Sequence, residues 1–276
     1  MEGKRPMNPL GINYYWDYEK KYGLTRENFC RLIAEIGFEG FFSVRRDRAE
    51  TDLFANLAAK HGLCYSSLHA PYAAVNEMWL EGDGGDAVLA EFCDTLSDAA
   101  DHAIPVVVMH MSSGDGAPPI SDIGRARFDK LVSCAVKNGV TLAFENQRKL
   151  ANLAYIFETY DDVPNVRFCW DMGHESALGP GFAYMPMFGK KAVYTHIHDN
   201  FCVHNGDIHL IPFDASIDFA ARVRNLADCG YTGPLTLELS GPRSEYYSGI
   251  SNEKYLHRAF LALEKLKNML QKEREN

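Results

Sequence analysis

The sequence predicts an α/β protein that folds as a single (β/α)₈ TIM barrel, with its active site at the carboxyl ends of the strands. Its 276 residues match the length of about 250 that one such barrel needs. Short apolar runs, typical of buried parallel strands, alternate with helix-like segments along the whole chain. Six of these runs end on histidine or carboxylate residues, and in a barrel all strand ends open onto one face.

The predicted elements follow one another as strand and helix. The eight strands are expected at residues 10–15, 40–44, 63–69, 105–110, 140–145, 166–171, 192–198 and 234–239. The helices are expected at residues 25–36, 52–61, 86–102, 121–138, 150–159, 217–229 and 252–272. Thr25 is a candidate N-cap, and Gly37, Gly62, Gly139 and Gly230 are expected to end helices.

The loops that follow strands are longer than those that follow helices. Residues 70–85 and 200–216 form long loops, and the Gly/Pro-rich segment 173–190 is expected to hold one weak helix at most. This asymmetry is typical of a barrel whose functional face lies opposite a structural face. Because no internal repeat or linker interrupts the pattern, one domain is expected over residues 1–276.

Composition favours some classes of function over others. Hydrophobic residues make up 46% of the chain and charged residues 24%, as in ordinary soluble proteins. The net charge of −9 argues against a nucleic-acid partner, because such partners need a basic face. Without an apolar signal or a membrane-length stretch, we expect a cytoplasmic protein with no membrane partner. Seven scattered cysteines predict reduced, mostly buried thiols. The sequence is also compatible with a homo-oligomer.

Three carboxylates lie at strand ends, where burial is costly unless they are paired, hydrogen-bonded or metal-bound. A salt bridge or a solvent-facing position would explain Glu145 or Glu238 alone. Together with Asp171 and a histidine of the intervening strand, they predict a divalent metal site with three oxygen ligands and one nitrogen ligand. Such a set suits Mn²⁺, Mg²⁺ or Co²⁺ better than a structural zinc cage.

Histidines accompany these carboxylates. His69 and His110 end two strands, and His174 follows Asp171 by three residues. His196 and His198 are two apart, so a strand places both on the same side. Farther along the chain lies the pair Asp207 and His209, for which an ordinary polar loop is an equally good explanation. The aromatic candidates for a pocket wall are Trp16, Tyr72, Trp79 and Phe201, although core packing explains aromatic residues equally well. Phosphate-binding loops and the G-x-S-x-G motif are absent, so no nucleotide cofactor is indicated.

Together these motifs resemble a known superfamily over nearly the whole chain. They are His-Ala-Pro-Tyr (69–72), Phe-Glu-Asn (144–146), Trp-Asp-Met-Gly-His (170–174), His-Ile-His-Asp-Asn (196–200), Asp-Ile-His (207–209) and Leu-Glu-Leu (237–239). In order and spacing they are similar to the xylose isomerase-like TIM barrels. That superfamily includes sugar and sugar-phosphate isomerases and epimerases, and the endonuclease IV-type apurinic/apyrimidinic endonucleases (AP endonuclease family 2).

The isomerase pattern implies a divalent cation (Mn²⁺, Mg²⁺, Co²⁺ or Zn²⁺) and a small carbohydrate substrate. The implied metal ligands are Glu145, Asp171, His196 and Glu238, with Asp199 as the acidic residue that follows the ligand histidine. Glu145 and Glu238 are then the catalytic base and acid for proton transfer through an enediolate. Four histidines are the implied substrate-binding residues: His69, His110, His174 and His198.

The nuclease pattern implies a trinuclear zinc site instead. Its additional metal ligands would be His69, His110, His174, Asp207 and His209. Residues 146–149 depart from the Thr/Gly-rich stretch that follows the central glutamate in the nucleases, and residues 213–215 replace the Gly-x-Gly turn of many sugar isomerases. A non-catalytic barrel that binds a sugar or metal is a third alternative. Arg148, Lys149 and Arg243 near strand ends leave phosphate recognition open.

Overall fold

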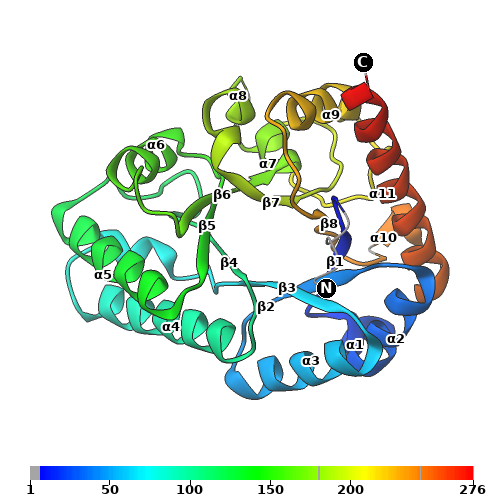
Figure 1. Ribbon diagram of the computed structural model, residues 1–276, viewed down its shortest axis with the longest axis horizontal. Helices are drawn as coiled ribbons and strands as arrows, with labels where there is room; N and C mark the ends of the chain where they lie inside the picture. Colours follow the sequence, from blue (N-terminus) through cyan, green and yellow to red (C-terminus); the bar gives the residue numbers. More distant parts are fainter. Residues whose placement is uncertain (1–6, 180, 243, 276) are drawn as a thin grey trace.

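The computed structural model describes residues 7–179, 181–242 and 244–275, and it shows eight strands arranged around a central axis and surrounded by helices (Figure 1). The strands are β1 (Leu10–Tyr14), β2 (Gly40–Val44), β3 (Cys64–His69), β4 (Val106–Met109), β5 (Thr141–Glu145), β6 (Val166–Asp171), β7 (Ala192–His196) and β8 (Leu235–Leu237). Paired neighbours run parallel in the order β7-β6-β5-β4-β3-β2-β1-β8.

Strands β7 and β8 also meet, which nearly closes the sheet into a barrel. Ile197 forms a parallel bridge with Leu237, and its N–H donates to the Thr236 carbonyl at 2.9 Å. The Glu238 N–H in turn donates to the Ile197 carbonyl at 3.0 Å. The prediction of a (β/α)₈ barrel is therefore confirmed.

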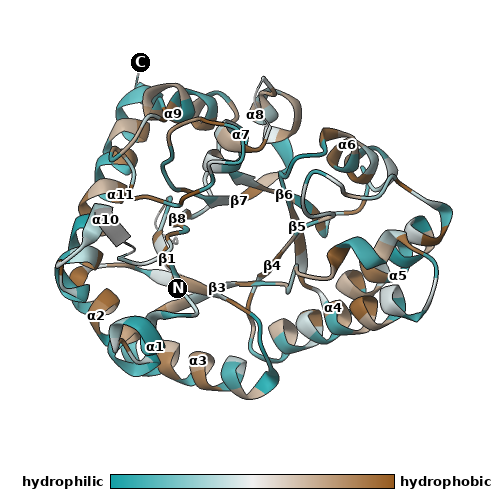
Figure 2. Cartoon of the chain, turned by 180° about the vertical axis from the view of Figure 1, so that it is seen from behind, coloured by the Kyte–Doolittle hydropathy of each residue, from teal (hydrophilic) through white to brown (hydrophobic). Residues whose placement is uncertain are grey.

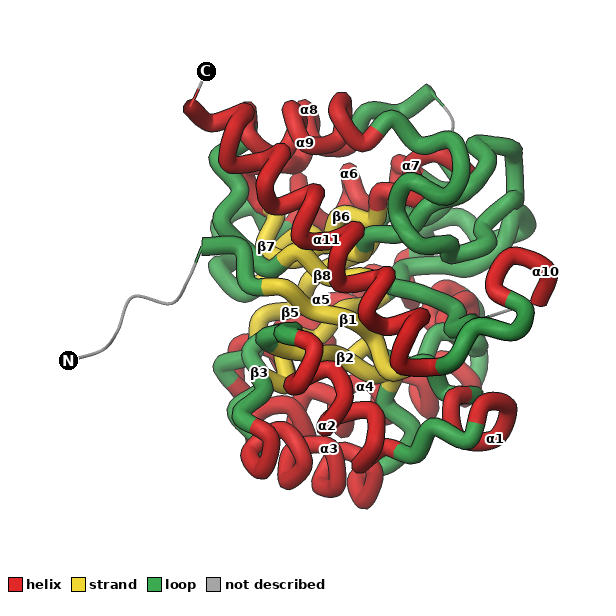
Figure 3. Tube along the Cα trace, turned by 90° about the vertical axis from the view of Figure 1, so that its right-hand side faces the viewer, coloured by secondary structure: helices red, strands yellow, loops and turns green. Residues whose placement is uncertain are grey.

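The helices form an outer ring, in which the long helices carry both hydrophobic and hydrophilic residues, as amphipathic helices do (Figures 2 and 3). They are α1 (Tyr18–Tyr22), α2 (Arg26–Ile36), α3 (Arg48–His61), α4 (Asp83–Asp101), α5 (Asp122–Asn138), α6 (Leu150–Thr159), α7 (Met172–Ala177), α8 (Tyr184–Phe188), α9 (Phe219–Asp228), α10 (Ser244–Tyr247) and α11 (Asn252–Glu275). Two 3₁₀ helices, η1 (Val75–Trp79) and η2 (Gly189–Lys191), lie in loops.

Several predicted boundaries were wrong by a few residues. Helix α3 begins at Arg48 rather than at residue 52, because the Asp47 side chain accepts a hydrogen bond from the Glu50 N–H at 2.8 Å. The segment 173–190 holds most of α7 and the whole of α8, rather than one weak helix at most. Both helices are too short for hydrophobic periodicity to reveal them.

Two apolar layers support the functional face. The larger core packs the helices against the outside of the barrel. A smaller cluster fills the barrel interior with Phe42, Val106, Val108, Ala143, Cys169 and Tyr194. Phe42 stacks on the imidazole of His196 with ring centroids 4.7 Å apart. The floor of the barrel therefore holds the strand-end side chains at a fixed depth.

The cysteines and helices bear on two further predictions. No cysteine forms a disulfide, as expected. Only Cys30 and Cys169 are buried, whereas Cys64 and Cys202 are exposed, so the expectation of mostly buried thiols was wrong. Among the described residues, no helix combines the length and the apolar character needed to cross a membrane.

Replacement of Arg127 by alanine should lower the free energy of unfolding by about 3 kcal/mol or more, because several buried acceptors would lose their donor. The guanidinium is buried and pairs with Asp86 at 3.0 Å. It also donates to the carbonyls of Glu77, Met78, Leu80 and Gly82. Urea unfolding measures the effect, and exposed Arg224 on α9 provides the matched control. Equal destabilisation by Arg127→Ala and Arg224→Ala would contradict this role.

Candidate metal centre

Four strand-end residues meet at the mouth of the barrel. Glu145 ends β5, Asp171 ends β6, His196 ends β7, and Glu238 directly follows β8. Each offers one ligand atom, and these four atoms lie within 4.8 Å of one another. Three of the side chains are fully buried, and that of Glu238 is 16% exposed. The convergence of strand ends predicted from the sequence is present in the structure.

Glu145 is the hub of this cluster. His69 and His110 approach its Oε2 through their Nε2 atoms at 3.2 and 2.8 Å. His174 and His196 approach its Oε1 through their Nδ1 atoms at 3.3 and 2.9 Å. Burial disfavours the charged carboxylate, but the interactions with His196, His110 and His174 outweigh it and hold the pKa of Glu145 well below its usual range. Glu145 is therefore ionised at neutral pH.

The unpaired polar atoms of the cluster fit a divalent cation. Asp171 Oδ2 and Glu238 Oε2 are buried and make no hydrogen bond. Buried polar atoms without a partner are costly, and a cation held beside His196 Nδ1, which lies 3.4 Å from Glu238 Oε2, would satisfy both. The donor set has three carboxylates and one imidazole, which is the chemistry of Mn²⁺, Mg²⁺ or Co²⁺ sites. These residues fit the group that the sequence predicts.

Sequence reasoning missed two residues that position the cluster. Asn146 exchanges two hydrogen bonds of 2.8 Å with the backbone of Asp171, which ties the end of β5 to the end of β6. Gln147 places its Nε2 3.1 Å from His110 Nε2 and 3.0 Å from His174 Nδ1. Asn146 and Gln147 are the two residues that follow Glu145, and this position after a strand-end ligand is the sequence signal that could have identified them.

Asp199 has a structural place beneath the long loop that follows β7. Its buried carboxylate accepts hydrogen bonds from the backbone N–H groups of Asn200, Ala215 and Ile217 at 2.8, 2.8 and 3.0 Å. These bonds close the two ends of loop 200–216 onto each other. Asp199 thus shapes the loop and is absent from the groups that could hold a metal.

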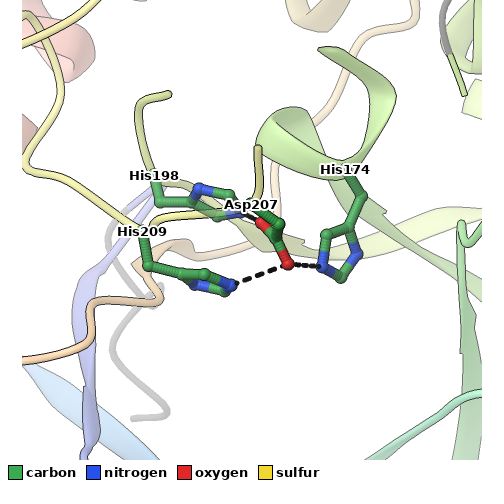
Figure 4. A group of neighbouring side chains, drawn as sticks. All are labelled: His174, His198, Asp207 and His209. Carbon is green, nitrogen blue, oxygen red and sulfur yellow. Dashed lines mark ion pairs between the residues drawn. The ribbon is translucent and has the colours of Figure 1, made fainter. Parts of the chain in front are cut away.

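A second group lies beside the first and contains His174, His198, Asp207 and His209 (Figure 4). Asp207 Oδ2 lies 3.2 Å from the Nε2 atoms of both His174 and His209, and Oδ1 lies 3.5 Å from His198 Nε2. Burial disfavours charge on His209, but Asp207 outweighs it and raises the pKa of His209 to about 9. Burial likewise opposes charge on His174, yet Asp171 and Asp207 raise its pKa well above the usual value.

A third group overlaps the first and comprises His69, Glu145 and His196. His110 belongs to none of the three groups, although it contacts Glu145. Its ring lies 4.8 Å from that of Tyr72, and the His69 ring lies 5.5 Å from the same tyrosine, measured between centroids. These two histidines therefore line the side of the centre that faces Tyr72.

A cavity of about 220 Å³ opens over the centre and is bordered by Asp207, His209 and Glu238. Trp16 and Tyr72, which are 58% and 45% exposed, form part of its wall, which is one of the two explanations that the sequence left open for them. Trp79 instead lies in the core, where it stacks on Phe128, and Phe201 packs near Tyr246. Among the described residues, no lysine or arginine lines this cavity.

The basic residues considered for phosphate recognition lie elsewhere. Arg148 pairs with Asp115 at 3.1 Å and donates two hydrogen bonds to Asn205, in a contact that joins three loops of the functional face. Lys149 directly precedes α6. Arg243 lies outside the described residues.

Residues 30–266 match the family described as xylose isomerase-like TIM barrel. This chain belongs to that family. Family membership agrees with the barrel and with the resemblance carried by the strand-end motifs.

Two curated relatives are uncharacterized proteins. One is y4fM of Sinorhizobium fredii, with 32% identity over 155 residues, which cover 56% of this chain and 47% of that protein. The chain thus spans about half the length of y4fM. The other is MJ1188 of Methanocaldococcus jannaschii, with 22% identity over 87% of this chain and 91% of that protein.

Solved structures of sugar epimerases share the fold. A D-tagatose 3-epimerase-like protein superposes with a TM-score of 0.74 and 19% identity over 97% of this chain and 98% of its own. D-psicose 3-epimerase from Clostridium cellulolyticum H10 has a TM-score of 0.74 and 14% identity, over 94% of this chain and 99% of its own. An L-ribulose 3-epimerase has a TM-score of 0.72 and 20% identity, over 96% of this chain and 97% of its own. At these identities the similarity establishes the fold, and function has to be argued from the site.

Proposed function

We propose that this protein is a divalent-metal-dependent isomerase or epimerase of a sugar, a sugar phosphate or a related polyol. The observation that carries the proposal is the set of Glu145, Asp171, His196 and Glu238, whose ligand atoms converge beside a cavity that Glu238 lines. Sugar epimerases among the structural neighbours support the same class of reaction. A cytoplasmic location and a homo-oligomeric state remain predictions from the sequence.

The chemistry is proton transfer at a carbon next to a carbonyl group. When bound, the cation would polarise the substrate oxygens and so acidify the carbon-bound proton. Glu145 and Glu238 are the proposed base and acid, which take the proton from one position and return it to another through an enediolate of the substrate. His196 Nδ1 lies between them, 2.9 Å from Glu145 Oε1 and 3.4 Å from Glu238 Oε2.

The surrounding side chains would orient the substrate. His69 and His110 pack against Tyr72, which lines the cavity, so they are the better placed of the four histidines proposed to bind substrate. His174 and His198 lie in the second group, on the side of Asp207. Trp16 and Tyr72 supply aromatic surface on which the apolar face of a sugar could pack.

Transfer of deuterium from solvent to substrate tests this mechanism. Free and phosphorylated ketoses and aldoses are incubated with the protein and Mn²⁺ or Co²⁺ in D₂O, and NMR follows the protons beside the carbonyl. The proposal predicts that at least one sugar gains deuterium at that carbon while its isomer or epimer forms. Complete absence of exchange across the set of sugars would contradict proton-transfer chemistry and favour the non-catalytic alternative.

Removal of the metal should abolish turnover and leave the fold in place. The buried Glu145 carboxylate and its histidines would still hold one another, whereas no cation would polarise the substrate. Chelation followed by dialysis is expected to reduce the rate to the background level, and added Mn²⁺ or Co²⁺ should restore it. Full activity of protein shown by elemental analysis to be metal-free would rule out this role.

The second and third groups of ligands favour one other candidate, a trinuclear apurinic-site endonuclease. All nine residues of that pattern lie around one mouth, which is the observation in its favour. The net charge of −9 and the absence of lysine or arginine from the cavity wall, within the described residues, count against DNA as substrate. Three tightly held zinc ions together with incision of abasic duplex DNA would establish the nuclease.

A further inference from the structure

We propose that Glu175 and Arg222 are positioning residues for the candidate metal centre, because their ion pair fixes the short helix α7 and thereby aims the Asp171 carboxylate. Neither side chain lines the cavity or belongs to a group that could hold a metal. The pair acts at a distance, since Arg222 lies on α9 in the outer ring of helices (Figure 1). The inference rests on the proposed function, which needs a metal at this centre.

Asp171 serves both the metal centre and helix α7. Its Oδ1 caps the helix, because it accepts a hydrogen bond of 2.5 Å from the His174 N–H in the first turn. Its Oδ2 is buried and makes no hydrogen bond, so this oxygen is left for a cation. Because both oxygens belong to one planar carboxylate, the position of α7 sets the direction in which Oδ2 points.

Helix α7 is too short to be stable through its own hydrogen bonds. It has six residues, whereas isolated helices shorter than about 12 residues are marginal in water. Contacts with the rest of the protein therefore have to hold it against the barrel. Glu175, whose side chain is 3% exposed, is the charged residue of α7 that is placed to make them.

Glu175 joins α7 to three other elements. Its Oε2 accepts hydrogen bonds from the indole N–H of Trp170 at 2.8 Å and from the backbone N–H of Tyr184 at 3.2 Å. Its Oε1 pairs with the guanidinium of Arg222. Trp170 is fully buried, so its indole N–H needs an acceptor. The carboxylate of Glu175 thus ties α7 to β6, α8 and α9 at once.

Arg222 supplies the positive charge that the buried Glu175 needs. Its guanidinium also donates to Ser176 Oγ at 2.8 Å, and it lies 5.9 Å from the centre of the Trp170 ring, within the range of a cation–π contact. Among the described residues, no other basic side chain forms an ion pair with Glu175. A buried carboxylate that loses its cationic partner is strongly disfavoured. Removal of the guanidinium should therefore displace Glu175, and α7 with it.

Mn²⁺ affinity tests the proposal at the metal centre itself. Mn²⁺ is titrated with metal-free protein, and the electron paramagnetic resonance signal of the free ion gives the dissociation constant. Arg222→Met keeps the length of the side chain and removes its charge. It should weaken Mn²⁺ binding about 10–100-fold, the usual effect of losing a residue that supports a metal ligand. Wild-type affinity in Arg222→Met that circular dichroism shows to be folded would overturn the proposal.

Two variants of the same helix distinguish positioning from a general effect on stability. Arg222→Lys retains a positive charge beside Glu175, so it should bind Mn²⁺ nearly as tightly as the wild type. Arg224→Met changes an exposed arginine two residues farther along α9, and it should have wild-type affinity. An equal loss of affinity in Arg224→Met and Arg222→Met would overturn the role of the ion pair.

Glu175→Gln replaces Arg222→Met if that variant does not fold. Glutamine keeps an acceptor for the indole of Trp170 and removes only the charge of Glu175. Weaker Mn²⁺ binding by folded Glu175→Gln would support the proposal, and wild-type affinity would overturn it.

Hydrogen exchange of the metal-free protein tests the positioning of α7 without any cation. The backbone N–H groups of Leu178 and Gly179 donate to the His174 carbonyl at 2.7 and 3.1 Å, so they report on the end of this helix. In Arg222→Met, mass spectrometry should show exchange of residues 172–179 that is faster by about tenfold or more, with unchanged exchange in α4 and α5. Unchanged exchange of residues 172–179 would overturn the proposal.

The affinity measurement separates this inference from the proposed function. A wild-type protein that binds no Mn²⁺ would contradict both. Tight binding of Mn²⁺ by the wild type, together with the same affinity in folded Arg222→Met, would overturn the positioning role alone and leave the isomerase proposal in place.

Discussion

Replacement of Glu238 by glutamine is expected to lower turnover by about 10²–10⁴-fold while the fold remains intact, because the change removes a group that gives and takes the proton. Glu238 is the one member of the first group that borders the cavity, and its Oε2 has no hydrogen-bond partner. Glutamine keeps the shape of the side chain, but it can neither accept the proton nor bind a cation with full charge. Steady-state kinetics on the substrate identified by deuterium exchange measure the loss.

Glu158→Gln is the matched control, because Glu158 is exposed on α6. It should have wild-type turnover and stability. Circular dichroism and thermal unfolding of Glu238→Gln should also match the wild type, which would separate a chemical role from a structural one. Wild-type turnover in Glu238→Gln would exclude Glu238 as acid or base.

Replacement of Glu145 by glutamine is expected to destabilise the metal-free protein by about 3–5 kcal/mol, the usual effect of removing one partner from a buried ionic cluster. Four imidazoles approach this carboxylate within 3.3 Å, and the side chain is fully buried. Neutral glutamine would leave the positive charge favoured on His174 and His196 without its central counter-charge, because the pKa values of both imidazoles are raised by neighbouring carboxylates. Urea unfolding of the chelated proteins measures the difference.

Glu158→Gln serves again as control, and it should leave the urea midpoint unchanged. Loading with metal adds a second expectation, because Glu145→Gln should gain less stability from added Mn²⁺ than the wild type does. An unchanged free energy of unfolding in metal-free Glu145→Gln would mean that the histidine cluster does not depend on this carboxylate.

The fold and the main ligands could be predicted from the sequence because strand ends carry a strong signal. An apolar run that stops on Glu145 or Asp171 places that carboxylate at the open end of a barrel, whatever the details of the helices. Parallel pairing then brings residues distant in sequence together, such as Glu145 and His196. All eight strands were predicted, and each predicted strand end lies within two residues of the observed one.

The rest depended on interactions between loops, which periodicity does not describe. Gln147 bridges His110 and His174 through contacts of 3.0–3.1 Å that only the folded backbone creates. His198 Nε2 lies 3.5 Å from Asp207 Oδ1, and the absence of a Cβ on Gly173 leaves room for its ring. Such juxtapositions arise from tertiary structure and leave little trace in composition or spacing.

The location of the bound metal tests the central claim most directly. A crystal of the protein soaked in Mn²⁺ and measured at the manganese absorption edge would show where the ion lies. We predict an anomalous peak among Glu145, Asp171, His196 and Glu238, with ligand atoms from all four residues bonded to it. A fully loaded protein with no manganese at this position, or with manganese held elsewhere, would contradict the proposed function.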